Sequence, residues 1–402
     1  MFWLIVLLVG FSVLMVASLI VRWTCQLLSL QHAVASANQH TICPACHRFV
    51  KLQYYQCDKC GQIHDLTPTE NEIYYRMCSC GRKISKLPTN GRYEFVAVCE
   101  HAECRHFLGR NAGRYPETVI PIIGGPSTGK SAFLSAWTVC SQTQFVYEQR
   151  AEISFPFPDG HEYARRCQRL FSTGAEPQKT SDRTPNGLGM DIVFTNRKRN
   201  TRLYLYDPAG EVFGYNPRSL QTFNYYNFMD GAAFLIDPFS IPIIRKKYES
   251  ELQISENKSA FQVFKDRTVD YSEKFIRGLY SHDLATNEYH YASCAVIITK
   301  ADAFDLDSQL GDKAARKRIA GTPRISYEDA LHEVCFEWLN EWGMGHVLKQ
   351  LQLHFKEVRC FSVSAFGHMP RSGQPFTPKR IEMPILWLMQ QKRHGDKLRR
   401  SR

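Results

Sequence analysis

The chain has 402 residues, enough for two or three domains. Hydrophobic residues make up 44% and charged residues 22%, so the composition is that of a folded protein and excludes a wholly disordered chain. The formal net charge is +11, and nearly half of this excess lies in residues 392–402, which hold six Lys/Arg against one Asp. Such a basic tail suits an acidic partner such as anionic lipid or RNA, although a solvated terminus explains it equally well.

The first 21 residues contain no charged side chain and are followed at once by Arg22 and Trp23. About 20 apolar residues span the hydrocarbon core of a bilayer as a helix. A secretory signal peptide would show a basic start, a shorter apolar stretch and a small-residue cleavage site, and none is clear here. We therefore predict an uncleaved transmembrane helix over residues 1–22 and a linker over 23–41. Positive charge follows the helix, which places the rest of the chain on the cytoplasmic side of the membrane.

Eight of the fourteen cysteines fall between residues 43 and 104. Two Cys-x-x-Cys pairs, separated by ten residues, have the spacing of ligands that share one tetrahedral Zn²⁺: Cys43, Cys46, Cys57 and Cys60. Gly61 would let the backbone turn tightly beside that metal. A less regular second set follows, in which His101 or His106 can replace one thiol: Cys78, Cys80, Cys99 and Cys104.

Four thiolates leave no open position on zinc, so we predict structural zinc in a zinc-ribbon module over residues 42–112. Disulfides are the alternative, but they are disfavoured in the cytoplasm. The other cysteines are scattered among apolar residues and are expected to be small buried side chains: Cys25, Cys140, Cys167, Cys294, Cys335 and Cys360.

A glycine-rich segment follows a predicted strand at Thr118–Ile123 and precedes a segment with helical spacing, "SAFLSAWTVC". It matches G-x-x-x-x-G-K-[ST] at every fixed position, in the strand–loop–helix context that a phosphate-binding loop requires. Its backbone N–H groups would converge on phosphates at the positive end of the helix. Lys130 would reach the β- and γ-phosphates, and Ser131 would ligate Mg²⁺. The loop consists of Gly124, Gly125, Pro126, Ser127, Thr128, Gly129, Lys130 and Ser131.

Four further apolar segments are predicted to contain strands: "RLYLYDPAGE", "GAAFLIDP", "CAVIITKAD" and "VRCFSVSAFG". Asp207, at the end of the first, can hold Mg²⁺, commonly through a water. "LHEVCFEWLNEW" has the period of an amphipathic helix, and "IEMPILWLMQ", before the basic tail, is expected to pack on the sheet, with a membrane-surface helix as the alternative.

The order phosphate loop, D-x-x-G, T-K-x-D and S-A-x resembles that of Ras-like GTPases of the P-loop class. "GLGMDIVF" and "LYLYDPAGE" look similar, more narrowly, to the bacterial double-GTPase group. The resemblance covers roughly Arg114 to Gln391, and it implies an α/β domain over residues 113–391 with a mostly parallel sheet, binding GTP or GDP with Mg²⁺. It assigns γ-phosphate sensing to Gly210, base covering to Lys300 beside Thr299, guanine N1 and N2 recognition to Asp302, and a contact with guanine O6 to the Ala365 N–H beside Ser364.

Two features depart from the family pattern. Glu211 follows Gly210 where the family often has a glutamine, and a carboxylate beside the γ-phosphate predicts slow intrinsic hydrolysis. The threonine that should meet Mg²⁺ in the switch segment is Thr180 or Thr184, with Thr184 closer to the next strand. Arg183 lies close enough in sequence to act on the phosphates in cis, although a solvated loop arginine is the simpler interpretation.

The leading hypothesis is a membrane-tethered GTP switch whose state is read by a partner protein, with an unidentified effector or regulator. An ATP-driven P-loop remodeller is a second hypothesis, against which the carboxylate of Asp302 argues. A third is a nucleic-acid-binding zinc ribbon with a vestigial nucleotide site, for which basic and aromatic residues in "CHRFVKLQYYQC" give some support.

Overall fold

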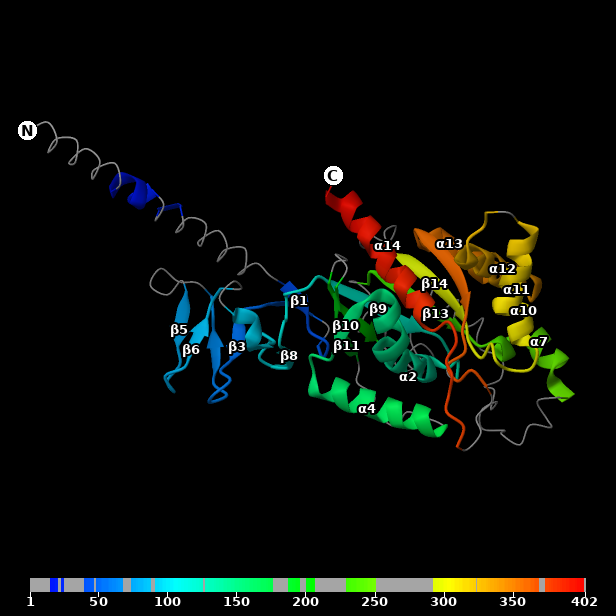
Figure 1. Ribbon diagram of the computed structural model, residues 1–402, viewed down its shortest axis with the longest axis horizontal. Coiled ribbons are helices and arrows are strands. Elements are labelled where there is room, and N and C mark those ends of the chain that lie inside the picture. Colours follow the sequence, from blue (N-terminus) through cyan, green and yellow to red (C-terminus); the bar gives the residue numbers. More distant parts are fainter. Residues whose placement is uncertain are drawn as a thin grey trace, which may run out of the picture. The chain divides into compact units, whose positions relative to one another are not determined.

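The computed structural model describes residues 15–20, 23–24, 40–46, 48–67, 74–87, 91–125, 127–175, 187–195, 200–206, 229–250, 292–322, 324–368 and 373–400. The chain divides into two compact units, residues 1–115 and 116–402 (Figure 1). Residues 15–20 are helical, but the rest of the predicted transmembrane segment lies outside the described residues. In the part of the chain that is described, no helix combines the length and the apolar character needed to cross a membrane.

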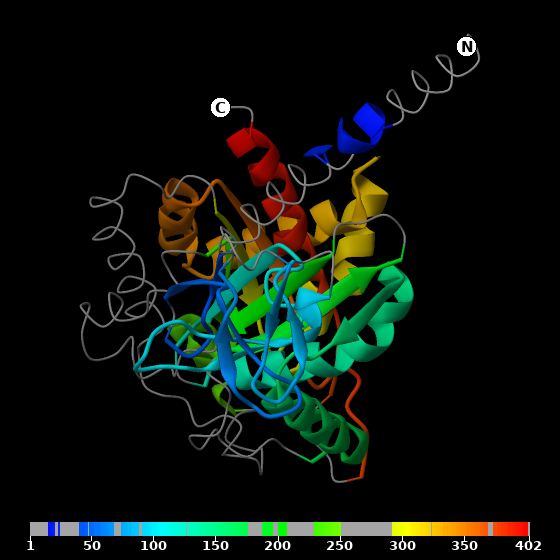
Figure 2. The same cartoon turned by 90° about the vertical axis from the view of Figure 1, so that its left-hand side faces the viewer.

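The first unit is built from three-residue strands joined by loops, as Figure 2 shows with this unit turned towards the viewer. Two pairs of strands form separate two-stranded hairpins: β1 (His40–Ile42) with β2 (Phe49–Lys51), and β5 (Tyr75–Met77) with β6 (Lys83–Ser85). The others form an antiparallel sheet in the order β4 (Ile63–Asp65), β3 (Tyr54–Gln56), β7 (Val96–Val98) and β8 (Phe107–Gly109). A short 3-10 helix, η2 (Arg92–Glu94), precedes β7.

The hydrophobic core of this unit is small, and cysteines form part of it. Apolar side chains such as Val50, Leu52, Tyr55 and Ile84 are almost completely buried together with four cysteines. A core of this size seldom stabilises a domain alone, so a module of this kind depends on metal ions or disulfides.

The second unit contains a seven-stranded sheet, which makes this part of the protein α/β. The strand order is β10 (Ala151–Ser154), β11 (Leu188–Phe194), β12 (Thr201–Tyr206), β9 (Glu117–Ile123), β13 (Gly231–Ile236), β14 (Ser293–Ile298) and β15 (Glu357–Ser362). The five strands from β12 to β15 in this order run parallel, and β10 and β11 are antiparallel to their neighbours. The sheet is therefore mostly parallel, as the sequence predicted.

Three of the parallel strands, β12, β13 and β14, are buried along their whole length, which is typical of a sheet with helices on both faces. One face shares a continuous core with α2 (Lys130–Cys140), α4 (Pro158–Thr173) and α14 (Glu382–Arg400). On the other face α12 (Tyr327–Glu341) packs on β15 (Figure 1). The amphipathic helix predicted around Leu331 and the packing of "IEMPILWLMQ" on the sheet are both confirmed.

Shorter helices complete this unit. α2 continues through a π-helical turn, η3 (Ser141–Phe145), into α3 (Val146–Gln149). After β13 come η5 (Pro238–Ser240) and α7 (Pro242–Lys247), and between β14 and β15 the chain forms α10 (Leu306–Leu310), α11 (Asp312–Gly321), α12 and α13 (Gly345–His354).

A fully buried ion pair joins β11 to β12, the strand that lies beside β9. Asp191 of β11 lies opposite Arg202 of β12, and the guanidinium donates from Nε to Oδ1 at 2.6 Å and from its terminal nitrogen to Oδ2 at 2.9 Å. The two side chains are 2% and 1% exposed. A buried pair is tolerated only when both charges are hydrogen-bonded in this way.

Candidate functional site: a phosphate loop and two cysteine clusters

The glycine-rich segment forms a tight loop between β9 and the first turn of α2, in the middle of the sheet. Gly129, the residue before α2, has φ of 88°, a left-handed conformation that favours glycine. Gly124 is required for a different reason, because a Cβ there would lie 2.7 Å from Thr128 Oγ1 and 3.0 Å from the carbonyl oxygen of Leu235. The sequence thus meets two separate backbone demands of this loop.

Lys130 folds back over the loop that precedes it. Its Nζ donates to the carbonyl oxygens of Gly124 at 2.8 Å and Gly125 at 2.9 Å, and the residue is 8% exposed. The Thr128 hydroxyl donates to the same Gly125 oxygen at 2.9 Å. The ammonium group is therefore held at the loop, beside the positive end of the α2 dipole, which favours an anion.

The T-K-x-D segment after β14 is joined directly to the phosphate loop. The Thr299 hydroxyl donates to the carbonyl oxygen of Thr128 at 2.9 Å, across 171 residues of sequence. A Cβ on Gly129 would lie 3.8 Å from the Thr299 side chain. Two motifs that the sequence placed on separate strands therefore meet at the carboxyl ends of those strands, where ligands bind to open α/β sheets.

The S-A-x segment after β15 completes this arrangement. The Ser364 hydroxyl donates to Asp302 Oδ1 at 2.5 Å, and Ser364 is fully buried. The backbone N–H of Ala301 donates to the carbonyl oxygen of Val363 at 3.1 Å, so the two segments are linked through backbone as well as side chain. These bonds fix the orientation of the Asp302 carboxylate.

Asp237, at the end of β13, is a residue of this site that the sequence argument missed. Its carboxylate forms an ion pair with Lys300, with 2.6 Å between Oδ2 and Nζ, and its other oxygen accepts from the Phe239 N–H at 3.0 Å. Lys300 itself has a left-handed φ of 53°. The available signal was a carboxylate directly after an apolar strand, "GAAFLID".

Several predicted site residues lie outside the described part of the chain. β12 ends at Tyr206, one residue before the predicted magnesium ligand Asp207. The same holds for the remaining loop, switch and D-x-x-G positions: Pro126, Thr180, Arg183, Thr184, Gly210 and Glu211. Their predicted roles stay predictions.

Comparison of the whole chain with protein-family models gives no match, and comparison with curated proteins gives no significant match.

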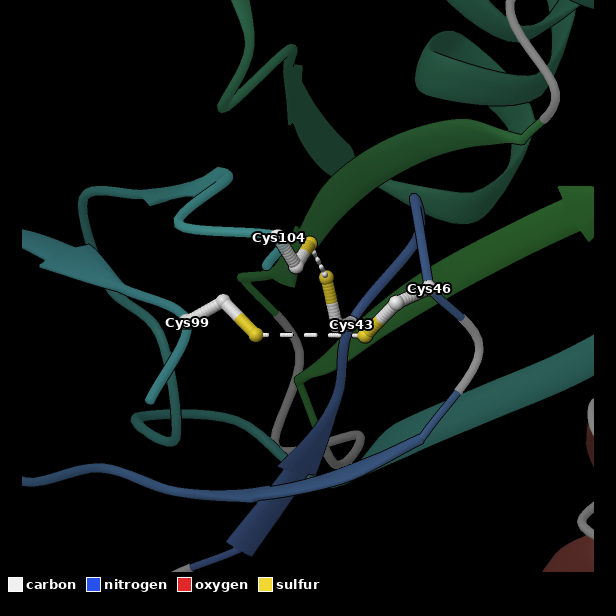
Figure 3. Close-up of side chains that lie close together, drawn as sticks. All are labelled: Cys43, Cys46, Cys99 and Cys104. Atoms are coloured by element: carbon white, nitrogen blue, oxygen red, sulfur yellow. Dashed lines mark hydrogen bonds between the residues drawn. The ribbon is translucent and has the colours of Figure 1, made fainter. Parts of the chain in front are cut away.

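The first unit gathers its eight predicted zinc-ligand cysteines into two groups of four. One group consists of Cys43, Cys46, Cys99 and Cys104 (Figure 3), and the other of Cys57, Cys60, Cys78 and Cys80. Within each group the sulfur atoms all lie within 4.8 Å of one another. The thiols are free rather than joined in disulfides.

The predicted grouping of these cysteines, in which the first two pairs shared one ion, is wrong. The groups are nested, because the first pair joins the fourth and the second joins the third. In each group an exposed ion pair also links the two turns that carry the cysteines. In the outer group Arg48 forms an ion pair with Glu103, and in the inner group Arg82 donates to both carboxylate oxygens of Asp58, at 3.0 and 2.9 Å.

Each cysteine pair lies in a turn of similar construction. In all four, the N–H of the first cysteine donates to the carbonyl oxygen of a residue that closes the turn, at 2.8 to 3.1 Å. Gly61 follows the second pair with φ of 77°, so the tight turn predicted there is confirmed. The thiols are therefore positioned by the backbone hydrogen bonds of these turns.

The thiol geometry fits zinc. With a Zn–S bond of about 2.3 Å, the edge of an ideal ZnS₄ tetrahedron is about 3.8 Å. The Sγ–Sγ distances are 3.7 Å for Cys43 and Cys104, 3.8 Å for Cys46 and Cys99, and 3.7 Å for Cys57 and Cys80. Between Cys60 and Cys78 the distance is 3.3 Å, somewhat short. Four thiolates close the coordination shell, so such an ion would be structural.

Neither predicted histidine is needed to complete the outer group. His101 Nδ1 lies 3.3 Å from Cys99 Sγ and 3.9 Å from Cys46 Sγ, beside the thiols rather than in place of one. The carbonyl oxygen of His106 accepts from the Cys99 N–H. A ring nitrogen at this distance can donate to a metal-bound sulfur, as partners of metal ligands commonly do.

The thiols differ in their readiness to ionise. Burial raises the pKa of Cys43 and raises the pKa of Cys99 to about 12. Hydrogen bonds, chiefly from the Cys80 backbone N–H, lower the pKa of Cys78 to about 5. Because zinc binds thiolates, metal entering the outer group must displace protons from these buried thiols.

Proposed function

We propose that this protein is a membrane-anchored GTP-binding protein that hydrolyses GTP slowly and acts as a switch. The observation that carries the proposal is the meeting of three motifs. Thr299 bonds to the phosphate loop, and Ser364 bonds to Asp302, so the segments after β9, β14 and β15 are joined at one end of the sheet. This is the arrangement in which one nucleotide can touch all three.

In this proposal each end of the nucleotide is bound by different chemistry. Lys130 and the N–H groups at the start of α2 bind the β- and γ-phosphates, and Ser131 contributes a hydroxyl ligand to Mg²⁺, which neutralises phosphate charge when bound. At the base, Asp302 accepts hydrogen bonds from N1–H and the 2-amino group of guanine. Adenine lacks this donor pair, so a carboxylate oriented by Ser364 favours GTP over ATP.

Hydrolysis is expected to be slow because of Glu211, which follows Gly210 in the sequence. A carboxylate beside the γ-phosphate repels it and is a poor substitute for the amide that positions the attacking water. A partner protein would then both read the GTP-bound state and accelerate its decay. Rapid GTP turnover by the purified chain alone would contradict this part of the proposal.

The test is nucleotide binding by the full-length chain, comparing GTP with ATP by equilibrium titration. Hydrogen bonds to a charged group contribute about 1.5–3 kcal/mol each. Asp302→Asn turns one acceptor into a donor and removes the charge from the other bond, so it should weaken GTP binding, by up to roughly 10²- to 10⁴-fold. Lys130→Ala should weaken binding of any triphosphate. Equal binding of GTP and ATP by the unaltered chain would refute the assignment.

Binding of a second nucleotide, XTP, shows whether Asp302→Asn has lost only guanine recognition or has lost its fold. Xanthine carries an oxygen where guanine carries its 2-amino group, so the amide of Asp302→Asn can donate to it. The variant should therefore bind XTP more tightly than the unaltered chain does. A variant that merely unfolds would gain nothing.

We further propose that residues 1–22 anchor the chain in a membrane, with the zinc and GTPase parts on the cytoplasmic side and the basic tail near anionic lipid. The apolar side chains of helical residues 15–20 support this, since Met15, Val16, Leu19 and Ile20 are each more than half exposed. Exposed apolar residues in succession need a nonaqueous partner. Release of the full-length chain from membranes by alkaline carbonate would contradict the anchor.

A further inference from the structure

The segment that precedes α14 contacts the S-A-x segment of the proposed base site. We call residues 364–366 the base loop and residues 373–381 the strap. Ser364 and Lys379 exchange backbone hydrogen bonds, at 3.1 and 2.9 Å, and the N–H of Thr377 donates to the carbonyl oxygen of Phe366 at 2.9 Å. The strap therefore pairs with both ends of the base loop, Ser364 and Phe366.

Aromatic packing fixes the same two segments. The rings of Phe366 and Phe376 stack with centroids 4.4 Å apart and an interplanar angle of 28°. Phe171, near the end of α4, meets the edge of Phe376 at 5.4 Å, and its carbonyl oxygen accepts from the Phe376 N–H at 2.9 Å. Figure 1 shows the strap, in orange-red, running beside this end of α4. Phe376 is thus held by α4 and holds Phe366 in turn.

Gly367, directly after the base loop, occupies a position where a side chain would not fit. Gly367 has φ of 79°, and a Cβ there would lie 1.9 Å from the carbonyl oxygen of Thr377. Its N–H donates to the Ser364 hydroxyl at 2.6 Å. The chain can turn here only because glycine lets the strap approach.

Arg380 fastens the other end of the strap. Its Nε donates to the carbonyl oxygen of Ser362 at 2.9 Å, and its two terminal nitrogens donate to Asp312 at 3.0 Å and Asp307 at 2.7 Å. The Arg380 side chain is 6% exposed, and its bonds to the two carboxylates, which are 35% and 56% exposed, are charge-assisted. The strap is therefore fixed at both ends, by Phe376 on α4 and by Arg380 on β15, α10 and α11.

We propose that the strap positions the backbone N–H of Ala365 for guanine O6, with Phe376 as the positioning residue. This inference rests on the proposed function. The Ala365 N–H shares a peptide with the Ser364 carbonyl oxygen, which accepts from the Lys379 N–H of the strap, and the stacking of Phe366 on Phe376 restrains the peptide on the other side of Ala365. Asp302 is oriented by the Ser364 hydroxyl, and Ser364 is held by Lys379 rather than by Phe376. We therefore expect loss of the Phe376 ring to weaken the contact with O6 more than the recognition of N1 and N2.

Two nucleotide analogues separate these contacts. In 6-thio-GTP a sulfur, a weaker acceptor, replaces O6, and the edge that faces Asp302 is kept. ITP lacks the 2-amino group but keeps O6. The ratio of GTP to 6-thio-GTP affinity thus reports the Ala365 contact, and the ratio of GTP to ITP affinity reports the Asp302 contact.

The experiment measures both ratios for the full-length chain and for Phe376→Ala. A net contribution of about 1 kcal/mol for one hydrogen bond corresponds to roughly a fivefold preference for GTP over 6-thio-GTP. We expect Phe376→Ala to bring this ratio close to one while the GTP to ITP ratio stays within about twofold of its original value. Phe376→Leu, which keeps most of the packing, should keep most of the preference.

Phe145→Ala is the matched control, because Phe145 is fully buried in the same core but packs against Trp137. It should leave both ratios unchanged at a similar cost in stability. Should Phe376→Ala not fold, Phe376→Val carries the same expectation.

The outcomes distinguish this inference from the proposed function. A chain that does not prefer GTP to ATP overturns both. A chain that prefers GTP but binds 6-thio-GTP equally well overturns only the strap inference. The strap inference is also overturned if Phe376→Ala keeps the GTP to 6-thio-GTP ratio, or if it and Phe145→Ala reduce both ratios alike.

Discussion

The nested cysteine grouping can be tested with two double substitutions, for which nested grouping and grouping by sequence order predict opposite zinc contents. Cys57→Ser with Cys80→Ser removes two ligands from the inner group alone. Cys43→Ser with Cys57→Ser removes one ligand from each group. The first variant should retain one zinc ion per chain and the second should retain none, against two for the unaltered protein. Grouping by sequence order predicts the opposite results.

The size of the effect follows from the geometry. Three of the four Sγ–Sγ distances given above, 3.7, 3.8 and 3.7 Å, match the tetrahedral edge of about 3.8 Å, so all four thiols of a group fit as ligands. Structural zinc contributes about 10–16 kcal/mol of binding free energy. If four thiolates share this equally, loss of two costs about 6 kcal/mol, or roughly a 10⁴-fold weaker site. A site that loses a single thiolate weakens by about 10²-fold on the same reckoning.

The assay is zinc content by elemental analysis after dialysis against a chelator whose affinity lies between the intact and the weakened sites. Substitution with ¹¹³Cd gives a second measurement, since each occupied four-thiolate site contributes one resonance. The reasoning fails if the variant lacking Cys57 and Cys80 loses both ions while the variant lacking Cys43 and Cys57 keeps one.

Three further outcomes are expected. Gly129→Ala, at φ of 88°, should lower the free energy of unfolding by about 1–2 kcal/mol and weaken nucleotide binding, whereas Gly321→Ala, in open space at the end of α11, should do neither. Denaturant titration of Asp191→Asn should show a loss of about 3–5 kcal/mol, partly recovered when Arg202→Met removes the other charge; no recovery would contradict the paired-charge argument. Burial acts to raise the pKa of Asp307, but hydrogen bonds from the two basic side chains of the strap outweigh it and lower that pKa below its usual 3.8. Stability from this carboxylate is therefore present above pH 3.8 and lost as the pH falls through its depressed pKa, and acid titration of Asp307→Asn should show a smaller loss in that range.

Local patterns were enough to predict most strands of the sheet and the helix that follows the phosphate loop. The apolar runs at β9, β12, β13, β14 and β15 are bounded by glycine, proline or charged residues, and the structure has a strand in each. They were recognisable because a sheet buried on both faces needs continuous apolar sequence. β10 and α4 were missed, since β10 is short and α4 has a polar average composition.

The sequence by itself determined the chemistry that this protein carries: eight thiols in four turns, a glycine-rich loop ending in Lys130, and carboxylates at strand ends. These features depend on residue type and on short spacings, both of which are visible in the sequence. Only the tertiary structure decided which of them act together. The outer cysteine group joins turns linked by an ion pair across 55 residues, and Asp237 meets Lys300 across 63 residues. The strap reaches the base loop through packing on α4, some 200 residues earlier in the chain. Such partnerships depend on where the sheet and its turns place distant side chains, and spacing along the chain carries no record of that.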